Sequence, residues 1–410
     1  MVFSWSTPLR QNGQTSLPLI PNEIYLAIFE CIAPTNEPLS EQNIQTFSAL
    51  AIVCRFFCSV ALPRVFERVA FSGNSSGNSS TINRAEASRK TKWAKQIVAN
   101  TEPSKSIALY VKECTFDSWS TNKDQQWVLF PFATLYCQAM ARMSNIRKVV
   151  ITKSFVKKEH WDAMAELKQL DDLKFSYCSF IEDPPDKELT VRTVTLLDLG
   201  DSPIPFTRAL RPIATTVLRS LEINEVEVVQ KLVAFRHLAI DNLIVERQIF
   251  DIEELLHVFR LLPDLESISC TLRRKEMVSP LIATFSLKKL FTRLRSFTIV
   301  GSGCYWLERH DMAKLLSALC DGPGTLPSLE ELHIHIPLGG AAGETFFVIS
   351  DLLNRTIIPA FPNLRYIYAG NDNYLHLEEG NWEVHYSQAL KKRVEHEHNK
   401  KLQAHKENMA

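Results

Sequence analysis

A short frame recurs along the second part of the chain: an apolar residue, two residues of any kind, an apolar residue, one residue, and a further apolar residue. Four copies read PDLESIS, TRLRSFTI, PSLEELHI and PNLRYIY, and each follows a segment with helical periodicity. Successive side chains of a strand point to opposite faces, so the last two apolar residues of each frame point into a core and the residue between them points outward. The copies begin at Ile146, Leu170, Val191, Leu218, Phe235, Leu265, Leu294, Leu329 and Leu364.

This alternation predicts an α/β fold whose sheet is covered by helices on one face only. A doubly wound sheet is buried on both faces and would need continuous apolar strands instead. The intervals between frames are uneven, from 17 residues (218 to 235) to 35 residues (294 to 329). We therefore expect an irregular α/β solenoid, in which each repeat packs mainly on its neighbours.

The segment that precedes the solenoid has a different pattern. In LPLIPNEIYLAIFECIAP, Pro21 suits the first turn of a helix, and apolar residues recur at four-residue spacing until Pro34 stops the helix. A polar stretch, TNEPLSEQNIQ, is expected to be a loop. The apolar stretch after it, TFSALAIVCRFFCSVALPRVF, predicts a second helix broken at Pro63. The run SGNSSGNSS has the composition of a flexible linker.

These patterns divide the chain into five parts. They are a disordered N-terminus (1–16), a short helical module (17–71), a flexible linker (72–83), the solenoid (84–370) and a charged tail, helical or disordered (371–410).

The helical module resembles the F-box, and more closely the F-box-like variant of fungal proteins. The resemblance consists of Leu-Pro followed by Pro-Asn-Glu-Ile, an apolar helix, and a second helix with Val-Cys-Arg-x-Phe that ends in Leu-Pro. The residues expected to form its core and its docking surface are Leu17, Pro18, Pro21, Ile24, Ile28, Phe29, Val53, Phe57 and Leu62.

Membership of this family implies docking to the Skp-family linker protein and, through it, to the cullin of an SCF-type ubiquitin ligase. The region that follows resembles the degenerate leucine-rich repeats that select the target protein in such adaptors, and SKSIALYVKECTF resembles the strand that opens them. A module of about 50 residues buries little apolar surface by itself, which fits a partner-binding role. The alternative is a protein-interaction scaffold in which these helices only cap the open end of the solenoid.

The outward positions of the frames supply the expected target surface. Mixed hydrogen-bonding side chains on a broad sheet suit recognition of a protein. The candidate residues are Lys174, Ser176, Glu222, Asn224, Asp241, Ser269, Thr271, Thr298, His333, His335 and Tyr368.

No sequence pattern points to catalysis, so we expect a protein that is not an enzyme and needs no cofactor. The glycine-rich stretches GSGCYW and DGPGTLP lack the Lys-Ser/Thr of a phosphate-binding loop. His333 and His335 lie on one strand face, but two ligands without a third do not make a zinc site. We therefore expect no metal centre.

Composition excludes several partner classes. Lys and Arg total 46, as do Asp and Glu, which argues against a polyelectrolyte role on nucleic acid or anionic lipid. The basic segment RKTKWAKQ is expected to be a solvated helix face with Trp93 packed inward. No apolar stretch is long enough to span a membrane, and no signal peptide is apparent. The nine cysteines are scattered singly, which is typical of reduced thiols in the cytoplasm or nucleus.

Overall fold

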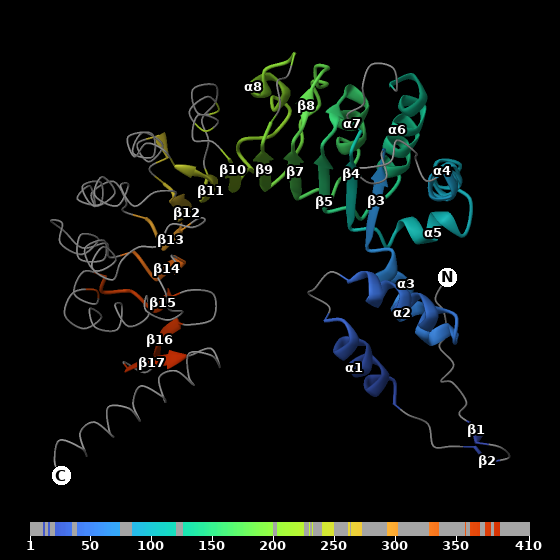
Figure 1. Ribbon diagram of the computed structural model, residues 1–410, viewed down its shortest axis with the longest axis horizontal. Coiled ribbons are helices and arrows are strands. Elements are labelled where there is room, and N and C mark those ends of the chain that lie inside the picture. The colour runs from blue at the N-terminus through green and yellow to red at the C-terminus, as the bar shows by residue number, and fades with distance from the viewer. Residues whose placement is uncertain are drawn as a thin grey trace, which may run out of the picture. The chain divides into compact units, whose positions relative to one another are not determined.

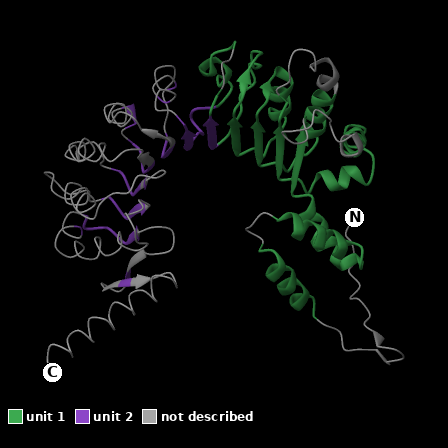
Figure 2. Ribbon diagram, viewed as in Figure 1, with its two compact units in different colours: residues 1–191, 198–213 green, residues 192–197, 214–410 purple. Residues whose placement is uncertain are grey.

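The protein is described by a computed structural model (Figure 1), and it divides into two compact units (Figure 2). The first unit comprises residues 1–191 and 198–213, and the second comprises residues 192–197 and 214–410. Both belong to a mixed α/β fold with a large sheet that is mostly parallel. The residues described are 11–12, 15–16, 21–34, 39–73, 84–119, 126–199, 203–224, 229, 232, 240–249, 261–262, 264–272, 293–301, 328–335, 357, 361–369, 374–378 and 381–385.

Three helices of equal length open the first unit: α1 (Asn22–Ile32), α2 (Glu41–Ala51) and α3 (Arg55–Val65). The expected polar loop and single second helix are therefore wrong. The Ser40 side chain accepts a hydrogen bond from the Asn43 N–H and starts α2 inside the expected loop. The chain then breaks at residues 52–54, where the Cys54 sulfur accepts the Phe57 N–H and starts α3.

Two further details of the N-terminal region differ from expectation. Pro63 does not break the helix, because α3 continues through it to Val65. The N-terminus contains a short antiparallel pair, β1 (Gln11–Asn12) and β2 (Thr15–Ser16), where disorder was expected.

The sheet of the first unit consists of four parallel strands whose order in space follows the chain. SKSIALYVKECTF was expected to be its opening strand, but this segment contains a short helix followed by the second strand. The four strands are β3 (Arg68–Ser72), β4 (Glu113–Asp117), β5 (Lys148–Thr152) and β7 (Asp172–Ser176).

Helices and two short strands complete this unit. Helices α4, α6 and α7 lie side by side along the sheet (Figure 1). The elements are α4 (Arg84–Val98), α5 (Ser104–Ala108), α6 (Gln126–Ala141), β6 (Phe155–Val156), α7 (Lys158–Met164), β8 (Ser179–Phe180) and α8 (Phe206–Ala209).

The second unit continues the same pattern with seven parallel strands and a final antiparallel hairpin. The hairpin lies within 371–410, so that segment is not wholly a helical or disordered tail. The strands are β9 (Thr193–Leu197), β10 (Ser220–Ile223), β11 (Asn242–Ile249), β12 (Ser267–Leu272), β13 (Ser296–Gly301), β14 (Glu331–His335), β15 (Tyr366–Ala369), β16 (Tyr374–Glu378) and β17 (Asn381–His385).

Eight of the nine predicted frames coincide with strands in a common register. The frame at Phe235 does not: Leu221 of β10 pairs with Leu243, so the frame of β11 begins at Ile240, five residues later. In β5 the residues alternate between half-exposed and buried, as the frame predicts. β9 is an exception, because its last four residues are all buried.

One hydrogen-bonding device repeats at the start of these strands. The carbonyl of the residue just before a strand accepts two N–H groups from the next strand's start, as when Glu67 accepts from Lys112 and Glu113. A carbonyl has two lone pairs, so it can satisfy both donors. These carbonyls all belong to charged residues: Glu67, Lys112, Arg147, Arg192, Arg219, Asp241, Glu266, Arg295 and Glu330.

A second device repeats at the ends of the strands. The residue immediately after β4, β5, β7 and β9 has a positive φ although it is not glycine, and these residues are Ser118, Lys153, Tyr177 and Asp198. The left-handed conformation costs an ordinary residue about 1–2 kcal/mol. The turns that follow these four strands are thus built with a local strain that the surrounding packing must offset.

Candidate docking surfaces

The three N-terminal helices enclose a small aromatic core. Phe29 of α1 is buried, and its ring centroid lies 5.4 Å from that of Phe47 on α2 and 5.4 Å from that of Phe57 on α3. Tyr25, one helical turn earlier, packs edge-on against Phe57 at 5.2 Å. Within α1, Phe29 is the buried residue, so the helix is attached to its neighbours along one aromatic edge.

The rest of α1 leaves apolar side chains in solvent. Ile24 is 51% exposed and Ile28 is 49% exposed, and Ala27 and Cys31 are also exposed. These four residues have the spacing i, i+3, i+4, i+7, so they form one stripe along the helix. On the other flank of the helix, Leu26 is 47% exposed.

The turn between α2 and α3 adds two apolar residues. Ile52 is 86% exposed and Val53 is 63% exposed. The turn leads directly into Phe56, whose ring lies 6.0 Å from that of Tyr25, so it reaches the first turn of α1. We call the α1 stripe together with this turn the apolar helix surface; its members are Ile24, Ala27, Ile28, Cys31, Ile52 and Val53.

The structure separates the expected core residues from the expected docking residues. Phe29 is buried, whereas Phe57 and Leu62 are half-buried, and Phe57 packs on the core cluster. Ile24, Ile28 and Val53 are exposed, as is Pro21 just before α1. Leu17 and Pro18 lie outside the described residues.

Sequence reasoning missed Ile52, the most exposed large apolar side chain of the described residues. The error follows from the single second helix that was expected, in which Ile52 would have been an interior position. The signal that could have found it is the cysteine of Ile-Val-Cys, because Cys54 can act as a helix cap at a junction between two helices.

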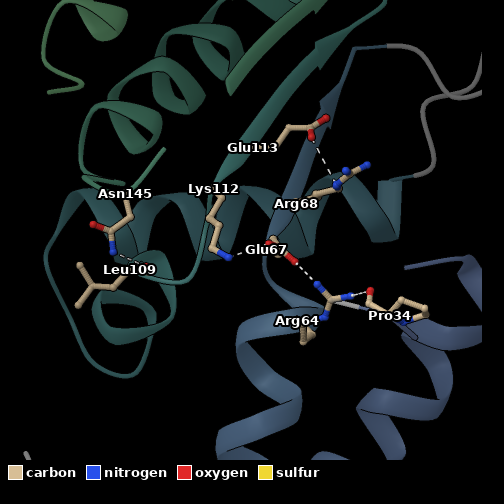
Figure 3. Close-up of polar contacts among 8 residues, drawn as sticks. All are labelled: Pro34, Arg64, Glu67, Arg68, Leu109, Lys112, Glu113 and Asn145. Atoms are coloured by element: carbon tan, nitrogen blue, oxygen red, sulfur yellow. Dashed lines mark hydrogen bonds and ion pairs between the residues drawn. The ribbon is translucent and has the colours of Figure 1, made fainter. Parts of the chain in front are cut away.

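An ion-pair junction ties these helices to the start of the sheet (Figure 3). Arg64, in the last turn of α3, pairs with Glu67 at 2.9 Å and also donates to the Pro34 carbonyl at 2.8 Å. The other Glu67 oxygen accepts from the Lys112 ammonium at 2.8 Å. Both carboxylate oxygens of Glu67 are therefore engaged, one by α3 and one by the residue before β4.

A ring contact reinforces this junction. Phe66, directly after α3, lies 6.2 Å from Trp93 of α4. Trp93, which was expected to pack inward from a basic helix, is half-buried, whereas Arg89, Lys92 and Lys95 of the same helix are exposed.

The second expected surface is the outward face of the sheet, and six of its candidates are half-exposed strand residues: Lys174, Glu222, Ser269, Thr298, His333 and Tyr368. Ser176 was expected on the exposed target surface, but it is buried, with 8% of its surface exposed. It is the last residue of β7, where the chain turns at Tyr177 and brings the Cys178 thiol back to the Ser176 carbonyl.

The remaining candidates lie beside the strands or outside the description. Asp241 precedes β11, where it pairs with Arg219 at 3.7 Å, and Asn224 follows β10. Thr271 and His335 belong to β12 and β14, but their side chains are outside the described part of the chain.

Charged residues of the first unit form pairs across the strands. The first residues of β3, β4, β5 and β7 lie side by side in register with alternating charge. Arg68 pairs with Glu113 at 3.3 Å, and Lys148 pairs with Asp172 at 2.9 Å. These cross-strand pairs neutralise the row.

In the second unit the outward face carries rings. His333 of β14 stacks on Tyr368 of β15 with centroids 4.1 Å apart and an interplanar angle of 7°. Tyr366 lies 6.2 Å from Tyr368, and His333 Nε2 lies 3.2 Å from a carboxylate oxygen of Glu331. The four side chains thus hold one another in place.

The buried cysteines of the first unit are Cys114, Cys137 and Cys178. Burial raises the pKa of the Cys178 thiol to about 11 and that of Cys137 well above its ordinary value, which favours the unreactive thiol form. Among the described residues, no three His, Cys, Asp or Glu side chains gather as metal ligands would. No helix there has the length and apolar character needed to cross a membrane.

Comparison with known proteins adds no relative: no family model matches the chain, and no curated protein matches it.

Proposed function

We propose that this protein is a non-catalytic substrate-recognition adaptor of an SCF-type ubiquitin ligase. Residues 17–71 would act as an F-box-like module that docks on a Skp-family linker protein and so reaches the cullin. The α/β region that follows would be an irregular solenoid resembling leucine-rich repeats, and its outward sheet face would bind the target protein.

The exposure of Ile24, Ile28 and Val53 is the observation that supports this proposal most. These residues belong to the set expected to form the core and the docking surface of the module, and they are left in solvent while Phe29 fills the core. Covering a half-exposed isoleucine with an apolar partner contributes roughly 1 kcal/mol, so the apolar helix surface offers several kcal/mol of binding free energy. An apolar helix face is a common way to occupy a groove on a partner.

The alternative function, a scaffold capped by these helices, makes a different demand on the same residues. A cap would bury its apolar stripe against the first strand or helix of the repeats. The attachment instead runs through the end of α3, by Arg64, Glu67 and Phe66. The scaffold alternative therefore does not explain why the apolar stripe on α1 is exposed.

The mechanism of such an adaptor is proximity. Holding the ligase at one end of the chain and the target at the other makes ubiquitin transfer effectively intramolecular. The adaptor needs no titratable centre of its own for this role.

The test is co-purification with the Skp-family linker of the same organism, comparing wild type with Ile24→Asp/Ile28→Asp. A carboxylate buried in an apolar contact costs several kcal/mol, and each 1.4 kcal/mol or so is tenfold in Kd, so the interaction should be lost. Gln45→Asp/Ser48→Asp is the matched control, because it adds the same charges at two exposed polar positions of α2. Circular-dichroism melts must show that both variants are folded.

Capture by wild type and by the control, with loss in the folded Ile24/Ile28 variant, would support the adaptor function. If wild type captures no linker, the adaptor proposal is refuted and the scaffold alternative remains.

A further inference from the structure

Four small hydroxyl side chains form a compact rectangle on the outward face of the second unit. Ser267 and Ser269 lie on β12, and Ser296 and Thr298 lie on β13, with 267 opposite 296 and 269 opposite 298. All four are half-exposed, and the residues between them, Ile268 and Phe297, are buried. Neighbouring strands lie about 4.8 Å apart, and same-face residues of one strand about 6.6 Å apart. We call these four residues the hydroxyl strip.

Larger side chains flank the hydroxyl strip on both sides. On β11 the flank consists of Asn242 and Ile244, which are exposed. On β14 it consists of Glu331 and His333, with His333 held against Tyr368 by the ring stack. The two flanks are three strand spacings apart, about 14 Å, whereas one extended strand occupies a single spacing of about 4.8 Å in a sheet. An extended polypeptide segment therefore fits between them along the strand direction.

The four hydroxyls make no side-chain hydrogen bond to any described residue. Each can donate one hydrogen bond and accept two. An extended chain presents backbone groups on one side every second residue, which matches the 6.6 Å or so between hydroxyls on one strand. The first unit differs, because a ligand over its charged row would have to separate Arg68 from Glu113 or Lys148 from Asp172.

The charge of the outward face of the second unit indicates which charge a bound peptide segment should carry. Among the outward positions of β10 to β15 whose side chains are described, two are carboxylates, Glu222 and Glu331, and none is Lys or Arg. The charged residues that precede strands β10 to β15 are balanced, three basic against three acidic: Arg219, Arg295 and Arg365 against Asp241, Glu266 and Glu330. A basic side chain placed beside Glu331 would gain a charge-assisted hydrogen bond, whereas an acidic one would be repelled.

We propose that the hydroxyl strip binds an extended segment of the target protein that turns small residues towards β12 and β13 and places a Lys or Arg at Glu331. The inference rests on the proposed function, because it names the class of target that the adaptor would select. The stacked rings of His333 and Tyr368 contribute as a rigid wall that loses little side-chain entropy on binding.

The test is selection of a random 12-residue peptide library, displayed on phage, against the full-length chain. The expected result is enrichment of peptides with one or more Lys or Arg among small residues. Synthetic versions of the enriched peptides should bind Ser269→Trp/Thr298→Trp at least about tenfold more weakly, because the indoles fill the strip. Thr115→Trp on β4, an outward position of the first unit, is the matched control and should bind as wild type does.

A second variant tests the inference without the bulky tryptophans, which could themselves disturb the fold. Glu331→Gln keeps the size of the side chain and removes its charge, so it should weaken binding about tenfold and reduce its dependence on salt. Enrichment of acidic peptides, no enrichment at all, or equal binding to the tryptophan variant would overturn the inference.

Linker capture separates this inference from the proposed function. Ser269→Trp/Thr298→Trp leaves the apolar helix surface untouched, so this variant should still capture the linker. Failure of peptide binding with normal linker capture would refute only the hydroxyl strip, whereas failure of linker capture by wild type would refute the adaptor function.

Discussion

The imidazole of His160 is almost completely buried, which makes the stability of the first unit depend on pH. The residue lies in the first turn of α7, where its Nδ1 accepts the Lys157 backbone N–H at 3.3 Å and its ring meets Phe116 edge-on at 5.2 Å. Burial, assisted by the positive charge of Lys157, lowers the pKa of His160 from 6.5 to about 4. The ring is therefore neutral in the folded protein at neutral pH.

The sign of the effect follows from proton uptake. As the pH falls through 6.5, the unfolded chain binds a proton at this histidine, but the folded chain does not until about pH 4. The free energy of unfolding therefore decreases across this window and levels off below it. The full shift corresponds to about 3 kcal/mol, of which about 2 kcal/mol is lost between about pH 7.5 and pH 5.

The measurement is urea unfolding followed by circular dichroism at several pH values, on wild type and on His160→Gln. Glutamine can accept the same Lys157 N–H but does not titrate, so the variant should lack about 2 kcal/mol of the decrease between pH 7.5 and 5. All other titrating groups are common to the two proteins and cancel in the comparison. If both proteins lose stability equally with falling pH, the reasoning from a buried neutral imidazole is wrong.

Four further substitutions test the packing and the turns by thermal and urea unfolding. Phe29→Ala should cost about 3–5 kcal/mol because it empties the core of the helical module, whereas Ile24→Ala, at an exposed site, should change stability by less than about 0.5 kcal/mol. Lys153→Gly should stabilise the protein by about 1 kcal/mol, since glycine adopts a positive φ without strain, and a loss of stability there would contradict the strained turn. Gly73→Ala should destabilise by about 1–3 kcal/mol, because a Cβ would lie 2.6 Å from the Ser118 carbonyl oxygen, and an unchanged melting temperature would count against that clash.

The recurring frame was a sufficient basis for predicting most of the sheet. Its apolar positions alternate with polar ones at a period of two, and a one-residue slip would turn the buried set into solvent, so the pattern and the register are coupled. The frame failed at Phe235 because FRHLAI satisfies the pattern by composition alone, while the strand needs Ile240, Leu243 and Val245 to face the core beside Leu221 and Ile223 of β10.

The division of the N-terminal helices was less predictable. The break between α2 and α3 contains neither glycine nor proline, and it depends on a thiol that caps a helix at Cys54. The apolar character of Ile52 and Val53 suggested helix interior, but the turn places them in solvent. The spacing of apolar residues in a sequence indicates which of them lie on one face of a helix. Whether that face is exposed depends on whether a neighbouring helix covers it.

The shared carbonyl found before nine of the described strands has a consequence for how such a chain can change in length. Because the pairing of one strand with the next is fixed by two N–H groups meeting at a single oxygen, it does not depend on how many residues the chain uses between the strands. Segments between strands can then lengthen or shorten without moving the sheet, as the unequal repeats of this sequence already do. An insertion grafted into one of these segments should therefore leave the outward face of the sheet unchanged. The residues of that face can then keep their positions while the segments between the strands vary in length.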